Sequence, residues 1–281
     1  MNTLSKIITG ISTATMLATG AYFYANNAAV KQNVDGVVKP FFGIGDTKVT
    51  PKIHNSVFLT IDGSGSGHST FSVPKVDTTY VNTLIDKIRT VGSGDLWISY
   101  IDGNARNNEV IYLAIPQAFN PPAKPTRNMG ESMKSFSERI FAYKNELKNF
   151  EAEAPELHKR FELDKQLFLQ KTQRLISTAY TQKNSSNDWS DVTGSVNVAL
   201  RTLETVTTDA SLFRTILLVS DARQSLPAGV PSEQMQIIPA DINVVLVNAA
   251  GSPGNVLTGH ATEVESLDRA LTKVIHVNKI P

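Results

Sequence analysis

Several residue types and patterns are missing from this chain, and each absence excludes a class of chemistry. The 281 residues contain no cysteine, which excludes disulfides, thiolate nucleophiles, thiolate zinc sites and lipid-modified cysteines. An excess of one charge is also missing, because 27 basic and 26 acidic residues leave a net charge of +1. We therefore expect no nucleic-acid partner and no general attraction to an anionic membrane surface.

Motifs of several enzyme classes are missing as well. The sequence has no phosphate loop of the Gly-x-x-x-x-Gly-Lys type and no His-Glu-x-x-His zinc motif. In Gly63-Ser64-Gly65-Ser66-Gly67, glycine occupies the central position at which a nucleophile elbow carries serine. These absences favour a binding protein over an enzyme.

An uncharged and largely apolar stretch, residues 7–24, follows Lys6 near the start of the chain. It is typical of a secretory signal or of an uncleaved membrane anchor, since its length is near the lower limit of about 17 residues for crossing a bilayer. A buried N-terminal helix is a third alternative, disfavoured by the glycines in the stretch. Residues 1–25 therefore predict an extracytoplasmic protein, secreted or attached to the membrane through this segment.

The remainder of the chain predicts a linker and then one α/β domain. Residues 26–54 lack sustained periodicity and contain several prolines and glycines, which is typical of a linker. From residue 55 to 281, strands are predicted at 57–62, 96–101, 109–115, 212–219 and 242–247, and helices at 76–91, 196–201 and 261–274. The second and third strands form a predicted antiparallel hairpin. This alternation predicts a Rossmann-like, doubly wound, mainly parallel sheet with one antiparallel edge strand.

A Pro-rich arm and a helix-forming segment interrupt the domain over residues 116–187. Between residues 131 and 180, apolar side chains recur at alternating steps of three and four, which indicates a heptad seam. Its members are Met133, Phe136, Ile140, Tyr143, Leu147, Phe150, Ala154, Leu157 and Phe161. Pro155 predicts either one long kinked helix or two helices that meet there. The seam could bind a partner helix, mediate self-association, or pack on itself or on the sheet.

An acidic residue followed by two serines at alternate positions ends the first predicted strand. Asp62, Ser64 and Ser66 bring one carboxylate and two hydroxyls round a single turn, and the intervening glycines supply backbone freedom. Hard oxygen ligands of this kind suit Mg²⁺ or Mn²⁺, with Ca²⁺ as a further possibility. The alternative is a glycine-serine turn without any ligand role.

This loop resembles the metal-ion-dependent adhesion site of von Willebrand factor A (vWA) domains, in which Asp-x-Ser-x-Ser follows the first, central strand of the sheet. The strand that ends at Asp221 resembles the fourth strand of that family, which carries a second aspartate. Thr193, on a predicted loop before the helix at 196–201, resembles the family's threonine, although its spacing is one residue longer. Asp191 and Ser195 are therefore possible substitutes. The resemblance implies a metal site made of Asp62, Ser64, Ser66, Thr193 and Asp221.

The resemblance also implies a function, namely adhesion or assembly through a shared metal ion. A bound Mg²⁺ usually retains water, so an acidic residue of a protein partner could take a solvent-facing position. Asp62 and Asp221 are both expected at the carboxyl ends of strands, where open α/β sheets bind their ligands. Two alternatives remain: a metal-dependent phosphoester hydrolase, and an architectural coiled-coil protein with a vestigial metal site.

Overall fold

The computed structural model describes five parts of the chain: residues 53–63, 73–181, 189–208, 210–247 and 255–276. The predicted export segment and nearly all of the predicted linker lie outside the described residues. Ser64 and Ser66 of the predicted metal loop lie outside them too. Among the residues that are described, no helix has both the length and the apolar character needed to cross a membrane.

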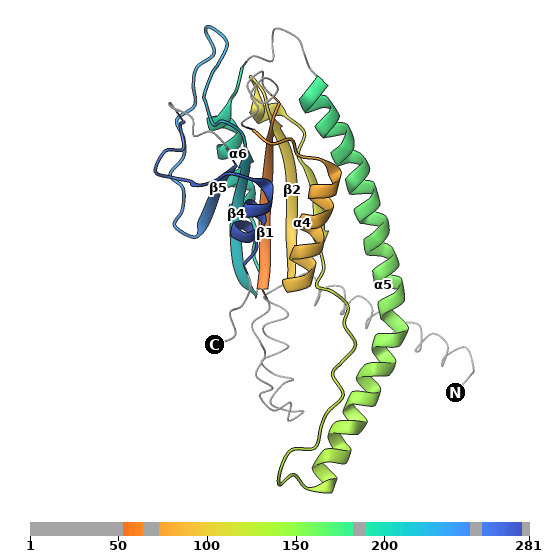
Figure 1. The fold of residues 1–281 in the computed structure, drawn as a ribbon. Helices are drawn as coiled ribbons and strands as arrows, with labels where there is room; N and C mark the ends of the chain where they lie inside the picture. The colour runs from red at the N-terminus through yellow and green to blue at the C-terminus, as the bar shows by residue number, and fades with distance from the viewer. Residues whose placement is uncertain (1–52, 64–72, 182–188, 209, 248–254, 277–281) are drawn as a thin grey trace, which may run out of the picture. The chain divides into compact units, whose positions relative to one another are not determined.

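A six-stranded sheet forms the centre of the described part of the chain (Figure 1). Its strands are β1 (Ile53–Asp62), β2 (Ser93–Ile101), β3 (Ile111–Ile115), β4 (Ser211–Val219), β5 (Ile242–Val247) and β6 (Thr262–Val264). They lie in the order β3-β2-β1-β4-β5-β6, with β3 antiparallel to β2 and the other pairs parallel. The predicted α/β fold, with its mainly parallel sheet and antiparallel edge strand, is confirmed.

Hydrophobic layers cover both faces of this sheet, and the alternation of side chains along β1 assigns residues to each layer. Leu59 and Ile61 face a layer that contains the buried residues of α4 (Thr78–Val91) and α7 (Leu267–Val274). Phe58 faces the opposite layer, which is built largely from α6 (Val192–Glu204). Because successive side chains of a strand point to opposite faces, Thr60 and Asp62 belong to the α6 face as well.

The predicted helical insertion forms a single continuous helix, α5 (Met133–Thr181), with Pro155 inside it. A helix of this length extends for about 70 Å. Its second half enters the core, where Phe161, Phe168 and Leu175 are buried. In its first half, residues 133–160, every side chain is half-buried or exposed. The alternative of two helices that meet at Pro155 is therefore wrong, and the second half of α5 packs on the domain.

Charged contacts fasten the second half of α5 to α4. Lys165 Nζ donates a hydrogen bond to Asp86 Oδ1 at 2.7 Å. The guanidinium of Arg89 donates to Glu162 Oε1 at 3.2 Å and lies 4.5 Å from the ring centroid of Phe161. An arginine held between a carboxylate and an aromatic ring uses both its charge and its planar face. These contacts fix the register of α5 against the domain.

Two sequence predictions of helix position are wrong. The segment predicted as one helix from Ala261 to Val274 instead forms β6, followed by the shorter helix α7. Thr262–Val264 pairs in parallel with β5, and the Ser266 hydroxyl then accepts the Arg269 N–H at 3.3 Å and caps α7. Helix α6 begins at Val192, four residues before its predicted start, so Thr193 lies within the helix and not on a preceding loop.

The packing of α4 generates a stability prediction. Leu84 is fully buried against the sheet, so its truncation to alanine leaves a cavity and should lower the free energy of unfolding by about 2–5 kcal/mol. Lys87, on the exposed side of the same helix, provides the control, because Lys87→Ala should change stability by less than about 0.5 kcal/mol. Urea denaturation of both variants measures the difference, and equal effects would contradict the observed orientation of α4.

Candidate functional site

Asp62 and Asp221 lie at the central switch point of the sheet. Asp62 is the last residue of β1, and Asp221 follows β4 by two positions. The two strands are adjacent and parallel, so their carboxyl ends meet at one edge. In the order β3-β2-β1-β4-β5-β6, the chain proceeds outward from β1 in one direction and from β4 in the other. Open α/β sheets bind ligands in the crevice at such a point.

A serine that the sequence analysis missed orients the Asp62 carboxylate. The Ser220 hydroxyl donates to Asp62 Oδ2 at 2.7 Å and accepts the Ala222 N–H at 2.9 Å. Because the backbone donor occupies an acceptor position on the serine oxygen, the single hydroxyl proton is directed toward Asp62. Asp62 is only 1% exposed. The β1–β4 register, which pairs Ile61 with Val219, is the feature that brings Ser220 beside it.

The Asp221 carboxylate is also buried, at 3% exposure. Its Oδ1 accepts the Arg223 N–H at 3.1 Å, and its Oδ2 lies 4.0 Å from Nε of the same arginine, whose side chain is 54% exposed. Ala222, between these residues, has a φ of 53°, a left-handed conformation that turns the chain sharply after Asp221. Burying ionised carboxylates is costly unless they are hydrogen-bonded, paired or bound to a metal. Both carboxylates are hydrogen-bonded here, and together they provide two anionic oxygen donors of the type that suits a hard cation.

Thr193 enters the site from the first turn of α6. It is 5% exposed, and its backbone N–H donates to Gln224 Oε1 at 2.9 Å. Within the described residues its hydroxyl takes part in no hydrogen bond. Since a hydroxyl oxygen keeps lone pairs for a cation, and α6 covers the face of the sheet to which Asp62 belongs, Thr193 stays a candidate neutral ligand. Gln224 was not identified from the sequence.

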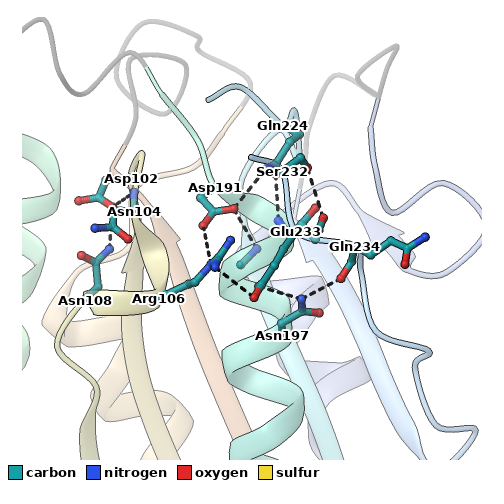
Figure 2. Close-up of polar contacts among 12 residues, drawn as sticks. Asp102, Asn104, Arg106, Asn108, Asp191, Asn197, Gln224, Ser232, Glu233 and Gln234 are labelled. Atoms are coloured by element: carbon teal, nitrogen blue, oxygen red, sulfur yellow. Dashed lines mark hydrogen bonds and ion pairs between the residues drawn. The ribbon is translucent and has the colours of Figure 1, made fainter. Parts of the chain in front are cut away.

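Asp191 is the N-terminal cap of α6, and Figure 2 shows its polar contacts. Its Oδ1 accepts the Gly194 N–H at 3.0 Å, which caps α6, and also accepts Gln224 Nε2 at 3.1 Å. Its Oδ2 lies 3.9 Å from Arg106 Nε. Ser195, the other possible substitute ligand, directs its hydroxyl to Thr60 Oγ1 at 3.4 Å. These contacts give Asp191 a capping role and turn Ser195 toward the sheet.

Polar contacts extend from Asp191 across the same edge of the sheet (Figure 2). Arg106, in the short helix η1 (Ala105–Asn107), pairs with Glu233 Oε1 at 3.2 Å. Glu233 Oε2 in turn accepts Asn197 Nδ2 at 3.1 Å. The network therefore joins the loop after β2, helix α6 and the segment after β4. It holds these three segments together around the switch point.

A pocket of about 470 Å³ lies beside this network. Its lining includes the polar residues Arg106, Asn107 and Asp191 and the apolar residues Leu226, Pro227, Val230 and Pro231. A concave surface with apolar walls and a few polar groups is the usual form of a binding pocket.

The described donors fit a hard cation in their chemistry. No three His, Cys, Asp or Glu side chains of the described residues gather closely enough to hold a metal ion. The predicted site instead combines two carboxylates, Asp62 and Asp221, with hydroxyls, of which Thr193 is described. All of these are oxygen donors, the type that Mg²⁺ and Mn²⁺ prefer.

Comparison with known proteins gives no family for this chain. No protein-family model matches the sequence, and no curated protein matches it. Any functional assignment therefore depends on the geometry of the site itself.

The capping role of Asp191 can be tested against a ligand role. Asp191→Ala removes the cap of α6 and should lower the free energy of unfolding by about 1–2 kcal/mol, whereas Asp191→Asn should retain most of the stability because asparagine also caps helices. Thermal or urea unfolding of the two variants gives the comparison. Unchanged stability in Asp191→Ala would contradict the capping assignment, and a loss of metal affinity of about tenfold or more in Asp191→Asn would assign Asp191 a ligand role.

Proposed function

We propose that this chain is a vWA-like protein-binding module for adhesion or assembly, and that a Mg²⁺ or Mn²⁺ ion mediates the binding. The ligands in this proposal are Asp62, Ser64, Ser66, Thr193 and Asp221. The observation that carries it is the pair of buried carboxylates, Asp62 and Asp221, at the switch point of the sheet and beside the first turn of α6.

The chain's own residues have separate roles in this mechanism. Ser220 orients the Asp62 carboxylate, and Gln224 holds the backbone of Thr193 while it also contacts the Asp191 cap. When bound, the cation supplies an electrophilic centre that can accept a carboxylate oxygen of a partner protein. The pocket beside Arg106 offers that partner a second, partly apolar contact.

The proposed location is extracytoplasmic, at the cell surface or in the periplasm. It rests on the uncharged stretch at residues 7–24, which would serve as an export signal or as a membrane anchor. An exported adhesion or assembly module is consistent with a chain that lacks cysteine and a basic excess.

The two alternatives differ in their support. For phosphoester hydrolysis, two of the four described histidines, His54 and His276, are poorly placed as general bases. His54 lies at the amino end of β1, and His276 stacks on Phe213 near the amino end of β4, so both are at the edge opposite to Asp62. The architectural alternative has more support, because Met133 and Phe141, on the first half of α5, are 62% and 68% exposed.

Metal titration tests the proposed ligands. The full chain should bind Mn²⁺ saturably in isothermal titration calorimetry, and Asp62→Asn or Asp221→Asn should weaken binding by at least about tenfold, since even the loss of an outer hydrogen-bond partner costs that much at many metal sites. Asp241→Asn is the matched control, because Asp241 is exposed and pairs with Arg214 at the opposite edge. Absence of saturable binding to the wild-type chain would refute the metal proposal.

Capture of a binding partner by this chain, together with a phosphodiesterase assay, distinguishes the metal-mediated binding module from the hydrolase and the architectural protein. Capture that requires Mg²⁺, is abolished by a chelator and is lost in Asp62→Asn supports the shared-metal mechanism. Metal-dependent phosphodiesterase turnover that is abolished in Asp221→Asn would favour the hydrolase. Capture that is unaffected by Asp62→Asn but lost in Phe141→Glu would favour the architectural alternative.

A further inference from the structure

The last turn of α5 touches the chain immediately after Asp62. A Cβ atom on Gly63 would lie 3.0 Å from the Ala179 carbonyl oxygen and 3.2 Å from Ala179 Cα. On its other side, the Gly63 N–H donates to the Ile101 carbonyl at 2.9 Å. Gly63 is therefore held between the backbone of α5 and the end of β2, in a space that admits no larger residue without a shift.

The next residue of the same turn contacts the chain where it enters α4. The Tyr180 hydroxyl accepts the Val76 N–H at 3.0 Å. Lys75 Nζ lies 5.8 Å from the ring centroid of Tyr180. Val76 itself is 1% exposed, so this hydrogen bond anchors the backbone at a buried point.

The phenol of Tyr180 also lies within electrostatic reach of the proposed metal ligand. Burial, with smaller contributions from the Asp62 and Asp77 carboxylates, raises the pKa of Tyr180 to about 12. The hydroxyl therefore stays neutral at physiological pH and adds no further negative charge beside Asp62.

We propose that Ala179 and Tyr180 are positioning residues for the metal site. Two consecutive residues of one helical turn hold Gly63, which follows Asp62, and Val76, which leads into α4. Because they belong to the same turn, they fix these two backbone points relative to each other. Mg²⁺ demands nearly ideal octahedral geometry, so its affinity depends on how firmly the ligands are held. This inference rests on the proposed metal-binding function.

A purely structural role makes a different prediction. If the end of α5 served only to complete the core, loss of the Tyr180 hydroxyl would lower stability and leave metal affinity unchanged. If it positions the site, metal affinity must fall as well, because the variant has to order the backbone when the metal binds. Metal affinity is therefore the readout that separates the two roles.

The main experiment measures Mn²⁺ binding to the full-length chain by isothermal titration calorimetry. Tyr180→Phe removes the acceptor for the Val76 N–H and should weaken Mn²⁺ binding by about two- to tenfold, the range expected for one hydrogen bond. Tyr143→Phe, on the half of α5 that leaves the core, is the matched control and should bind like wild type. Thermal unfolding without metal shows how much of any effect is loss of stability.

A second variant acts on the other contact. Gly63→Ala places a methyl group against the Ala179 carbonyl and should also weaken Mn²⁺ binding, with the Tyr180 hydroxyl still present. Wild-type affinity in both variants would overturn the positioning role and leave the proposed function intact. No binding by the wild-type chain would overturn both.

A measurement that keeps both Gly63 and Tyr180 covers the case in which neither variant folds. Tyrosines are replaced by 3-fluorotyrosine, and the fluorine signal of Tyr180 is assigned by elimination, using Tyr→Phe variants of the other tyrosines. Addition of Mg²⁺ should shift the Tyr180 signal and leave that of Tyr143 in place. A Tyr180 signal that does not respond to saturating Mg²⁺ would overturn the inference.

Discussion

The parallel pairing of β1 with β4 is the constraint on which the candidate site depends. Its register places Ile61 beside Val219, so the next residue of each strand, Asp62 and Ser220, can share a hydrogen bond. A slip of one residue would turn the Asp62 side chain to the opposite face, away from α6. The same pairing defines the switch point at which β1 and β4 lead outward in opposite directions. Site chemistry and sheet topology are therefore fixed by one set of backbone hydrogen bonds.

The polar groups around that point are held by one another, and α6 links them. Its N-terminal cap, Asp191, accepts a hydrogen bond from the side-chain amide of Gln224. The side-chain carbonyl oxygen of the same glutamine accepts the Thr193 N–H. One glutamine side chain thus satisfies a donor in the first turn of α6 and also binds the residue that caps it. A carboxylate at this helix end also interacts favourably with the helix dipole. The Asp191 carboxylate therefore caps α6. Asp62 and Asp221 are the pair of carboxylates at the switch point.

Sequence patterns predicted the strands, and the positions of two aspartates at the carboxyl ends of strands, because those features are local. Buried parallel strands are continuous apolar runs. Asp62 is the last residue of β1, and Asp221 follows β4 by two positions. The contact from Ser220 to Asp62 depends on register between residues far apart in the chain, and no local pattern encodes it. Asp191 precedes α6 as a typical cap residue, a role that its residue type also predicts, whereas the vWA-like spacing predicts a ligand. Strand β6 was missed because its three residues are too few to show a period.

The long helix combines two stretches with different sources of stability. Its second half is held by the core, beginning at Phe161, whereas its first half has little tertiary contact. Formation of the first turn of a helix is unfavourable, and most helical stability in proteins comes from tertiary packing. Here the packed half supplies the nucleus, and the first half needs only propagation, which its Lys, Glu and Leu residues favour. Pro155 removes one backbone donor six residues before Phe161. The helix is thus weakest near Pro155, toward the end of its first half, and the end that contacts Gly63 stays fixed to the domain.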